Sequence, residues 1–210
     1  MPDEKRILCG VPIPPNFMAD ARVVAQVEAW HAAGDGVESY YPTTRSAESG
    51  QHKIVHFALY AKPRATHILF LDYDVIPRPN TLKRLLSHDK DIISGVYPIY
   101  KNRKIVWCLS TEEPFAAMSI NDIPNNIFKA KTICNGMMLV KTEVFDKLEW
   151  PYWESKWKPG GYEILGADVH FCMKARDAGF DLWVDPKVKC EHIKSVGLLG
   201  IAKTYIMKGK

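Results

Sequence analysis

The 210-residue sequence contains no apolar run near the length of about 20 residues that a membrane-spanning helix requires. Its first residues, Met-Pro-Asp-Glu-Lys-Arg, lack the apolar segment of a secretory signal peptide. Internal repeats and low-complexity linkers are also missing. We therefore expect a globular, cytoplasmic protein with no transmembrane segment, while the sequence leaves its oligomeric state open.

Cysteine is scarce, and its spacing fits neither a zinc site nor a disulfide framework. The cysteines are odd in number, widely separated and without a Cys-x-x-Cys pair, namely Cys9, Cys108, Cys134, Cys172 and Cys190. Structural zinc sites and small secreted disulfide folds need paired or closely spaced cysteines. This pattern predicts free thiols in a reducing compartment.

The sequence also lacks a run of Lys or Arg residues, although its formal net charge is +4. Proteins that bind nucleic acid usually gather basic residues on one face. Nucleic acid is therefore permitted as a partner but not indicated, and a small anionic ligand suits the charge equally well. The chain length and the hydrophobic content of 47% are sufficient for a substantial core.

The most informative stretch is the segment from Thr66 to Pro79, THILFLDYDVIPRP. Ile68 to Leu71 form a short apolar run that predicts a buried strand, and Asp72 and Asp74 follow it directly. Parallel α/β sheets bind ligands beyond the carboxyl ends of their strands. Strand alternation would place both carboxylates on one side and Tyr73 on the other. Such a pair suits a hard divalent cation that also holds substrate phosphates, whereas the simpler alternative is that both acids only cap the turn.

At this point the sequence resembles a known family. The pattern ATHILFLDYDVIPRPNTLKRLL, followed by DKDIISGVYP, is similar to the Asp-x-Asp segment of GT-A-fold glycosyltransferases, and of family 2 in particular. The resemblance implies that Asp72 and Asp74 hold Mn²⁺ or Mg²⁺ together with the diphosphate of a nucleotide-sugar. It implies a UDP- or GDP-linked donor, and it extends over nearly the whole chain.

The predicted order of elements supports the same fold class. Strands are predicted at residues 6–11, 37–41, 68–71, 91–97, 104–109, 127–130, 132–140, 180–184 and 188–190, and helices at 17–33, 52–61, 80–87, 142–148 and 168–178. A β-α-β-α-β start is typical of the nucleotide-binding half of an α/β protein. We expect a GT-A-like (Rossmann-like) α/β fold with a mixed, mostly parallel sheet flanked by helices. Residues 1–210 would form one domain, with a nucleotide-sugar half at 6–100, an acceptor half at 101–195 and a tail at 196–210.

A second candidate site lies at Leu165–Cys172, LGADVHFC. By itself, Asp168 would be interpreted as an acid that caps and stabilises a helix N-terminus. Its position well after the Asp-x-Asp strand and just before ARDAGFDLWVDP resembles the Glu-Asp segment of family 2 glycosyltransferases. The resemblance implies that Asp168 is the general base that deprotonates the acceptor hydroxyl. Ala167 stands where that family usually has Glu, which puts acceptor binding, or activity itself, in question.

The resemblance also implies a third metal ligand and a nucleotide-binding surface. A His just after the last strand completes the metal site of many GT-A enzymes, and His192 occupies that position, although a lone His is more often structural. The nucleotide would contact the loop after the first strand, the polar segment after the second strand and the acid motif. These candidates are Pro12, Ile13, Thr44, Arg45, Asp72 and Tyr73. Arg45 could bind a phosphate with two hydrogen bonds, and an exposed loop Arg is an equally good interpretation.

An aromatic-rich segment at residues 149–162 is predicted to be a surface loop that contacts the acceptor. It holds Trp150, Tyr152, Trp153 and Trp157 next to several Pro and Gly residues. Flat aromatic faces stack on sugar rings, and binding residues gather on loops. A satellite hydrophobic cluster or an oligomer contact would explain the same aromatics equally well. The acceptor and sugar candidates are Asn135, Gly136, Trp153, Trp157 and Gly166.

Together these features predict a metal-dependent, hexosyltransferase-like glycosyltransferase that moves a sugar from a nucleotide-sugar to an acceptor hydroxyl, with inversion. The acceptor could be a glycan, a lipid, a small molecule or modified nucleic acid. A catalytically impaired protein that binds nucleotide-sugar or glycan stays an alternative because of Ala167. A phosphatase of the haloacid dehalogenase type also uses Asp-x-Asp, but that family has the motif on its first strand, whereas here it follows the third.

Overall fold

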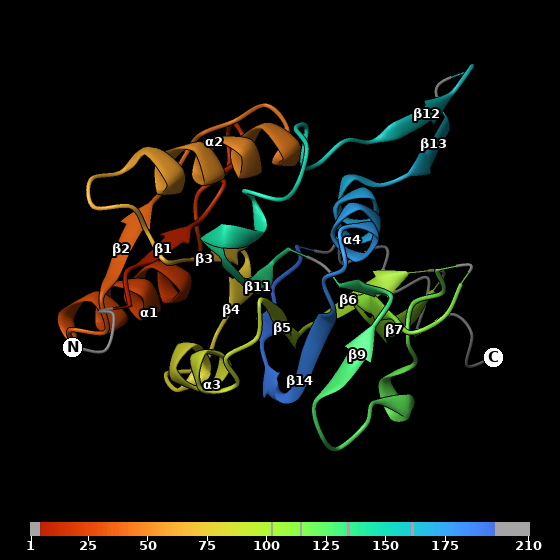
Figure 1. Cartoon of the computed structure of the whole chain (residues 1–210). Helices are drawn as coiled ribbons and strands as arrows, with labels where there is room; N and C mark the ends of the chain where they lie inside the picture. The colour runs from red at the N-terminus through yellow and green to blue at the C-terminus, as the bar shows by residue number, and fades with distance from the viewer. Residues whose placement is uncertain (1–4, 102, 114, 134, 161, 196–210) are drawn as a thin grey trace.

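The computed structural model describes residues 5–101, 103–113, 115–133, 135–160 and 162–195. One seven-stranded sheet crosses the molecule and carries helices on both faces (Figure 1). The expected α/β class with a mixed sheet is confirmed. The predicted tail at 196–210 and Cys134 lie outside the described residues.

The central sheet has the strand order β2-β1-β3-β11-β5-β14-β9. Its strands are β1 (Ile7–Gly10), β2 (Val37–Tyr40), β3 (His67–Leu71), β5 (Ile92–Val96), β9 (Phe128–Ala130), β11 (Met137–Lys141) and β14 (Leu182–Lys189). All run in one direction except β9 and β11, so the sheet is mostly parallel, as predicted. β1, β3 and β5 are buried along their whole length, because both faces of the sheet are covered.

Two separate cores lie on the two faces of the sheet. Helices α1 (Ala21–Ala32) and α3 (Thr81–Ser87) cover one face, and α2 (Ala47–Tyr60) and α4 (Ala167–Asp177) cover the other. Side chains alternate along β3, so that Phe70 enters the core under α2 and α4 while Leu69 enters the core under α1 and α3. None of the helices in the described ranges is both long and apolar enough to cross a bilayer.

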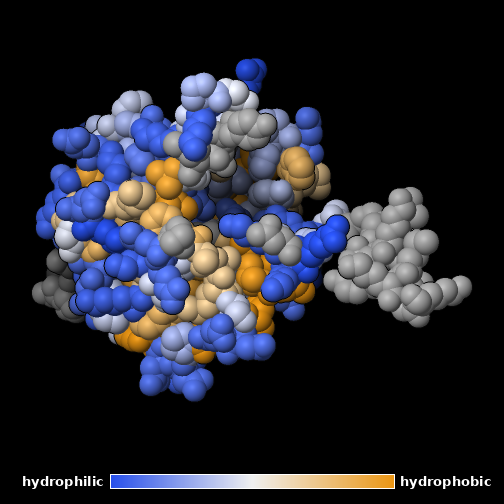
Figure 2. All heavy atoms as spheres, turned by 90° about the vertical axis from the view of Figure 1, so that its right-hand side faces the viewer, coloured by the Kyte–Doolittle hydropathy of each residue, from blue (hydrophilic) through white to orange (hydrophobic). Residues whose placement is uncertain are grey.

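Short elements surround the sheet. They are the strand pairs β4 (Val75–Ile76) with β15 (Glu191–His192), β6 (Pro98–Lys101) with β7 (Lys104–Trp107), β8 (Leu109–Ser110) with β10 (Thr132–Ile133) and β12 (Lys156–Lys158) with β13 (Tyr162–Leu165), and the 3₁₀ helices η1 (Ile120–Asp122) and η2 (Thr142–Val144). The β12–β13 hairpin projects from the body of the molecule beside α4 (Figure 1). On the face turned toward the viewer in Figure 2, hydrophobic residues reach the surface among hydrophilic ones.

Two helices begin four or five residues from the predicted position, because side-chain caps set their ends. α1 begins at Ala21 rather than at residue 17. Its N-cap is Asp20, whose Oδ1 accepts the backbone N–H of Arg22 at 2.9 Å. α2 begins at Ala47 rather than at residue 52. Its N-cap is Ser46, whose Oγ accepts a backbone N–H from the first turn. The polar segment after β2 is therefore a helix cap, and it places the N-terminus of α2 at the edge of the sheet.

The second half of the chain is less regular than predicted. The strands expected at 180–184 and 188–190 are one strand, β14, whose register is irregular after Val184. The helix expected at 142–148 is reduced to η2, and the Thr142 hydroxyl donates to the carbonyl of Ala65 at 2.8 Å. The surface loop expected at 149–162 includes β12 and the start of β13.

The prediction that all cysteines are free is wrong for Cys108, which is disulfide-bonded. Cys9, Cys172 and Cys190 are free and buried. Burial raises the pKa of Cys172 to about 12, so this thiol is inert at neutral pH. Disulfides are uncommon in reducing compartments. The cysteines therefore no longer support the prediction of a reducing compartment.

Candidate functional site

The predicted nucleotide-binding residues meet at one edge of the central sheet, where the parallel strands β1, β2 and β3 end. Because these strands share a direction, the segments that follow them leave the sheet at the same edge. They form a cleft of about 270 Å³ with the start of α2. The residues that line it are Pro12, Pro14, Thr44, Arg45, Ser46, Ala47, Asp72, Tyr73, Asp74 and Lys194.

Backbone hydrogen bonds hold the loops after β1 and β2 against each other. The Ile13 N–H donates to the Pro42 carbonyl at 3.0 Å, and the Thr44 N–H donates to the Ile13 carbonyl at 3.1 Å. The hydroxyl of Thr44 also donates to the Ser46 carbonyl at 2.8 Å, next to the start of α2. Ile13 therefore supports the cleft through its backbone, whereas Thr44 lines the cleft and fixes the cap of α2.

A close approach of α2 to the first loop brings a helix N-terminus to the cleft. A Cβ added at Gly50 would lie 2.6 Å from Pro12 Cβ, so only glycine allows this approach without a shift. Arg45 is exposed and precedes the Ser46 cap. Free backbone N–H groups of a helix N-terminus and a nearby guanidinium both favour an anion at this position.

The two acids lie in a turn that follows the strand. β3 ends at Leu71, and the Val75 N–H donates to the Asp72 carbonyl at 3.1 Å. Strand alternation therefore does not apply to these residues, and that step of the prediction is wrong. Asp72 and Asp74 nevertheless line the same cleft, and Tyr73, which was expected to point away, lines it too.

Gly136 and Tyr97 confine the side chain of Asp72. The Asp72 N–H donates to the Gly136 carbonyl at 3.1 Å, and the Gly136 N–H donates to Tyr97 Oη at 3.2 Å. A Cβ added at Gly136 would lie 2.4 Å from Asp72 Oδ2. Burial raises the pKa of Asp72 to about 6, and the negative charge of Asp74 adds to the shift. A cation in the cleft would relieve this repulsion.

Asp74 lies between two side chains from the last described segment. The pairing of β15 with β4 sets His192 opposite Val75. His192 Nε2 lies 3.4 Å from Asp74 Oδ1, and Lys194 Nζ lies 2.6 Å from Asp74 Oδ2. Burial alone would raise the pKa of Asp74, but the hydrogen bonds from His192 and Lys194 lower it below its usual value. The sequence reasoning missed Lys194, whose one signal is its place two residues after His192.

The donor atoms near Asp74 fit a hard divalent cation that arrives with a phosphate ligand. His192 Nδ1 lies 2.8 Å from the Pro98 carbonyl, so that ring nitrogen donates there and Nε2 faces Asp74. Metal-binding histidines are typically oriented in this way. Mg²⁺ is commonly held by one or two carboxylates, with waters and substrate phosphates completing its shell. In the described part of the chain, no group of three or more His, Cys, Asp or Glu side chains is arranged to hold a metal, so the protein alone does not supply a closed cage.

Asp168 lies in the first turn of α4, next to the segment that leads into β11. Asn135 Nδ2 donates to Asp168 Oδ1 at 2.6 Å. Gly166, another candidate, is the N-cap residue of α4 and contributes no side-chain cap. Burial raises the pKa of Tyr97 well above its usual value, and the charges of Asp72 and Asp168 both add to the shift. Tyr97 is therefore within electrostatic reach of both the acid motif and the candidate base.

The structure buries Trp153, which was predicted to bind the acceptor, inside an aromatic cluster. Trp153 is 1% exposed, and its ring stacks on Phe171 with centroids 4.5 Å apart, next to Phe70 and Phe145. The alternative of a hydrophobic cluster is therefore correct for Trp153, which cannot stack on a sugar from this position. Trp157 on β12 is 60% exposed and available to a ligand.

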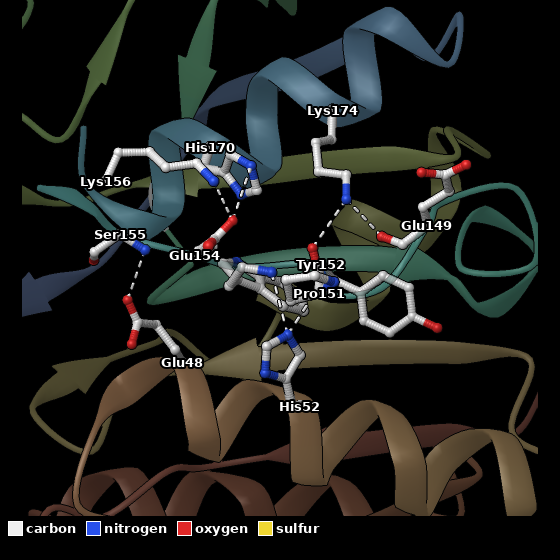
Figure 3. Close-up of polar contacts among 11 residues, drawn as sticks. Glu48, His52, Glu149, Pro151, Tyr152, Glu154, Ser155, Lys156, His170 and Lys174 are labelled. Carbon is white, nitrogen blue, oxygen red and sulfur yellow. Dashed lines mark hydrogen bonds and ion pairs between the residues drawn. The ribbon is translucent and has the colours of Figure 1, made fainter. Parts of the chain in front are cut away.

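Polar contacts that the sequence did not reveal hold residues 149–156 between α2 and α4 (Figure 3). His52 Nε2 accepts the backbone N–H groups of Tyr152 and Trp153 at 3.1 and 3.2 Å. Burial lowers the pKa of His52, which keeps this lone pair available. Glu48 Oε1 accepts the backbone N–H of Ser155 at 2.9 Å. No sequence pattern signals these bonds, because their donors are backbone groups about a hundred residues away.

The same segment is attached to α4 from the other side (Figure 3). Lys174 Nζ donates to the carbonyls of Glu149 and Pro151 at 2.6 and 3.0 Å. His170 Nε2 lies 3.9 Å from Glu154 Oε2. The β12–β13 hairpin therefore projects from a base that is fixed to both helices.

No family model matches this sequence, and no curated protein matches it. Several solved structures share its fold. A197 from STIV aligns with a TM-score of 0.63 and 15% identity over 90% of this chain and 86% of that one. GalNAc-T7, crystallised with UDP, GalNAc and Mn²⁺, aligns with a TM-score of 0.56 and 9% identity over 93% of this chain and 45% of that one. The catalytic domain of Drosophila β1,4-galactosyltransferase 7, in complex with xylobiose, aligns with a TM-score of 0.55 and 14% identity over 91% of this chain and 71% of that one.

The chain has a GT-A-like fold. This confirms the expected fold class, while identities of 9–15% establish the fold alone. In this GT-A-like chain, the cleft with Asp72 and Asp74 lies beyond the carboxyl ends of the strands, where open α/β sheets bind their ligands.

Proposed function

We propose that the chain is a glycosyltransferase that binds a nucleotide-sugar in the cleft at Asp72 and Asp74 and transfers the sugar to an acceptor hydroxyl. The observation that carries the proposal is the convergence of three features at one edge of the sheet. These are the acid pair, the N-terminus of α2 with Arg45, and Asp168 held by Asn135. The fold supports it, because two structural neighbours are named as glycosyltransferases.

The donor would be a UDP- or GDP-linked sugar whose nucleotide rests against Pro12, Ile13, Thr44 and Tyr73. Its diphosphate would face Arg45 and the N-terminal N–H groups of α2, which favour an anion. GalNAc-T7, one of the neighbours, was crystallised with UDP.

Asp74 and His192 would hold a Mn²⁺ or Mg²⁺ ion, with Asp72 beside it. When bound, the cation acts as a Lewis acid that neutralises the charge of the departing diphosphate. The chain contributes the orientation of His192 through Pro98 and the position of Asp72, which Gly136 and Tyr97 confine.

Asp168 would accept the proton of the acceptor hydroxyl while that oxygen forms the new bond to the anomeric carbon. The bond from the same carbon to the diphosphate breaks on the opposite face, which gives inversion. Asn135 donates to Asp168 Oδ1 and thereby fixes the orientation of the carboxylate. A general base must be held within hydrogen-bond reach of the proton that it removes.

The acceptor would bind between Asp168 and the β12–β13 hairpin. Gly166 at the start of α4 carries no side chain, and the exposed ring of Trp157 can stack on a sugar. Gly136 would contribute through Asp72, whose carboxylate occupies the space that a Cβ would need. Among a glycan, a lipid, a small molecule and modified nucleic acid, these features favour a glycan.

A protein that binds a nucleotide-sugar without transferring it is the second candidate. Ala167 stands where the resembled family has Glu, and it packs against the core on the α2 and α4 side of the sheet. The start of α4 therefore offers Asp168 as its one carboxylate in the first turn.

Thermal unfolding with UDP, GDP, CMP or TDP, each with Mn²⁺ or with EDTA, tests the proposal. A nucleotide at about 100 times its Kd stabilises the fold by about 2.7 kcal/mol, which raises the Tm of a chain this long by roughly 5–10 °C. We expect such a rise for one nucleotide in Mn²⁺, its loss in EDTA and its loss in Asp74→Asn. The exposed Asp177 on α4 provides the matched control Asp177→Asn, which should keep the rise.

Two results would count against the proposal. The absence of a shift with every nucleotide would refute nucleotide binding in the cleft. A metal-dependent shift without sugar transfer to any glycan acceptor would select the binding protein over the enzyme.

A further inference from the structure

Lys194 connects the acid pair to the place proposed for the diphosphate. It lines the nucleotide cleft with Arg45, Asp72 and Asp74, and it also lines an adjoining hollow of about 390 Å³ beside Tyr73. Its Nζ lies 2.6 Å from Asp74 Oδ2. The Lys194 side chain is 56% exposed, whereas that of Asp74 is 12% exposed. The lysine can therefore swing on its flexible stem, while the carboxylate is fixed.

The ammonium of Lys194 neutralises a carboxylate that has little water around it. Asp72 and Asp74 line the same cleft, so their negative charges repel each other, and Lys194 brings a positive charge to Asp74. His192 approaches Asp74 Oδ1 and Lys194 approaches Asp74 Oδ2, so both carboxylate oxygens already have a partner. A divalent cation can reach Asp74 Oδ2 only if the ammonium leaves it.

We infer that Lys194 and the divalent cation are alternative partners of Asp74, and that Lys194, once displaced, binds the diphosphate in the same cleft. This inference rests on the proposed function. A cation at Asp74 repels the ammonium, and the diphosphate is the anion that Lys194 can reach next. Metal and nucleotide would therefore bind jointly, and the metal alone would bind weakly because it must first break the ion pair.

The first measurement is Mn²⁺ binding to the nucleotide-free protein, followed through the electron paramagnetic resonance signal of free Mn²⁺. Lys194→Met keeps the length of the side chain and removes its charge. We expect it to tighten Mn²⁺ binding by about two- to fivefold, which is the range for a partly exposed ion pair. The Mn²⁺ affinity of Lys194→Arg should stay near that of the parent, because the positive charge is kept. Lys83→Met, on the exposed surface of α3, controls for the change in net charge.

The second measurement is nucleoside diphosphate binding at saturating Mn²⁺, by titration calorimetry with UDP and GDP. Lys194→Met should weaken binding of the preferred nucleotide by about tenfold, because a charge-assisted hydrogen bond to phosphate is lost. Lys194→Met should thus tighten Mn²⁺ binding and weaken nucleotide binding. These opposite effects distinguish an exchange of partners at Asp74 from a general loss of structure, which would weaken the binding of both ligands.

Unchanged Mn²⁺ affinity in Lys194→Met, or unchanged nucleotide affinity at saturating Mn²⁺, would overturn the inference. An equal effect in Lys83→Met would overturn it as well, because net charge would then be the cause. If the parent protein binds Mn²⁺ but neither nucleotide, the proposed function fails, and with it the phosphate contact of Lys194. The Mn²⁺ titration then still decides whether Lys194 competes for Asp74.

Discussion

Replacement of Gly136 by Ala tests whether the confined geometry around Asp72 is needed for nucleotide binding. The added Cβ would lie 2.4 Å from Asp72 Oδ2 and 2.7 Å from Tyr97 Oη. Real Cβ contacts essentially never fall below 3.0 Å, so the carboxylate must move by at least 0.6 Å, the difference between 3.0 and 2.4 Å. Tyr97 is buried and accepts the Gly136 N–H, so it cannot move without loss of this hydrogen bond. Overpacking of this kind costs about 1–3 kcal/mol.

We expect the Tm of Gly136→Ala to fall by roughly 2–12 °C, at about 2–4 °C per kcal/mol for a chain of this size. The metal-dependent rise in Tm with UDP or GDP should disappear, because the Asp72 carboxylate is displaced. Gly95→Ala is the matched control, since its Cβ would lie 2.5 Å from Val188 Cγ1 and 2.8 Å from the Val188 carbonyl. It should lower the Tm and keep the nucleotide shift.

The double variant Gly136→Ala, Tyr97→Phe adds a second check, because loss of the hydroxyl opens space on one side of the new methyl group. The same change leaves the N–H at position 136 without its acceptor and keeps the contact with Asp72 Oδ2, so the Tm of the double variant should not exceed that of Gly136→Ala. A Gly136→Ala variant with the Tm and nucleotide shift of the parent would refute the reasoning. Loss of the nucleotide shift in Gly95→Ala as well would assign the effect to general destabilisation instead of to Asp72.

Three further predictions concern the base, the buried ion pair and pH. Asp168→Asn should lower the transfer rate by about 10²–10⁴-fold and leave the nucleotide shift intact, and a fully active variant would exclude Asp168 as the base. Asp185→Ala should lower the free energy of unfolding by about 1.5–3 kcal/mol, because the buried carboxylate accepts hydrogen bonds from Arg84, His88 and the Lys187 N–H while the remaining Arg84 can be solvated. A loss under about 1 kcal/mol in chemical denaturation would contradict this. Burial lowers the pKa of His67 from 6.5 to about 4, so the folded state favours its neutral form. The contribution of neutral His67 to the free energy of unfolding is therefore fully present above about pH 6.5. As the pH falls from 6.5 toward 4, the free energy of unfolding decreases by roughly 2–3 kcal/mol. His67→Gln should flatten the stability curve between pH 7 and 4.5, and an unchanged slope would argue against His67 as its cause.

Local sequence was sufficient to predict the strand that ends at the acids. The apolar run at 68–71 is fully buried, and the cleft lies directly beyond it. Periodicity and turn residues carry this information within a few residues, so the prediction needs no knowledge of distant partners. The same holds for α3, which was predicted at 80–87 and spans Thr81–Ser87.

The features that the sequence did not reveal depend on contacts between distant segments. Trp153 is buried because Phe171, Phe145 and Phe70 surround it, and its local sequence is equally compatible with an exposed loop. Lys194 reaches Asp74 across 120 residues of sequence because β15 pairs with β4. Single-sequence reasoning has no means to predict such pairings, and it fails at helix starts where a cap outweighs periodicity.

The antiparallel strand β11 limits how such a protein can be divided or recombined. It lies after residue 100 in the sequence, yet it pairs with both β3 and β5, which lie before that residue. A fragment that ends at residue 100 would leave those two strands with open edges facing each other, and open strand edges favour aggregation. The halves therefore cannot be exchanged as modules between related proteins. Segments outside these shared strands can vary without disturbing the pairing, and the β12–β13 hairpin, which projects from the body of the molecule, is one of them (Figure 1).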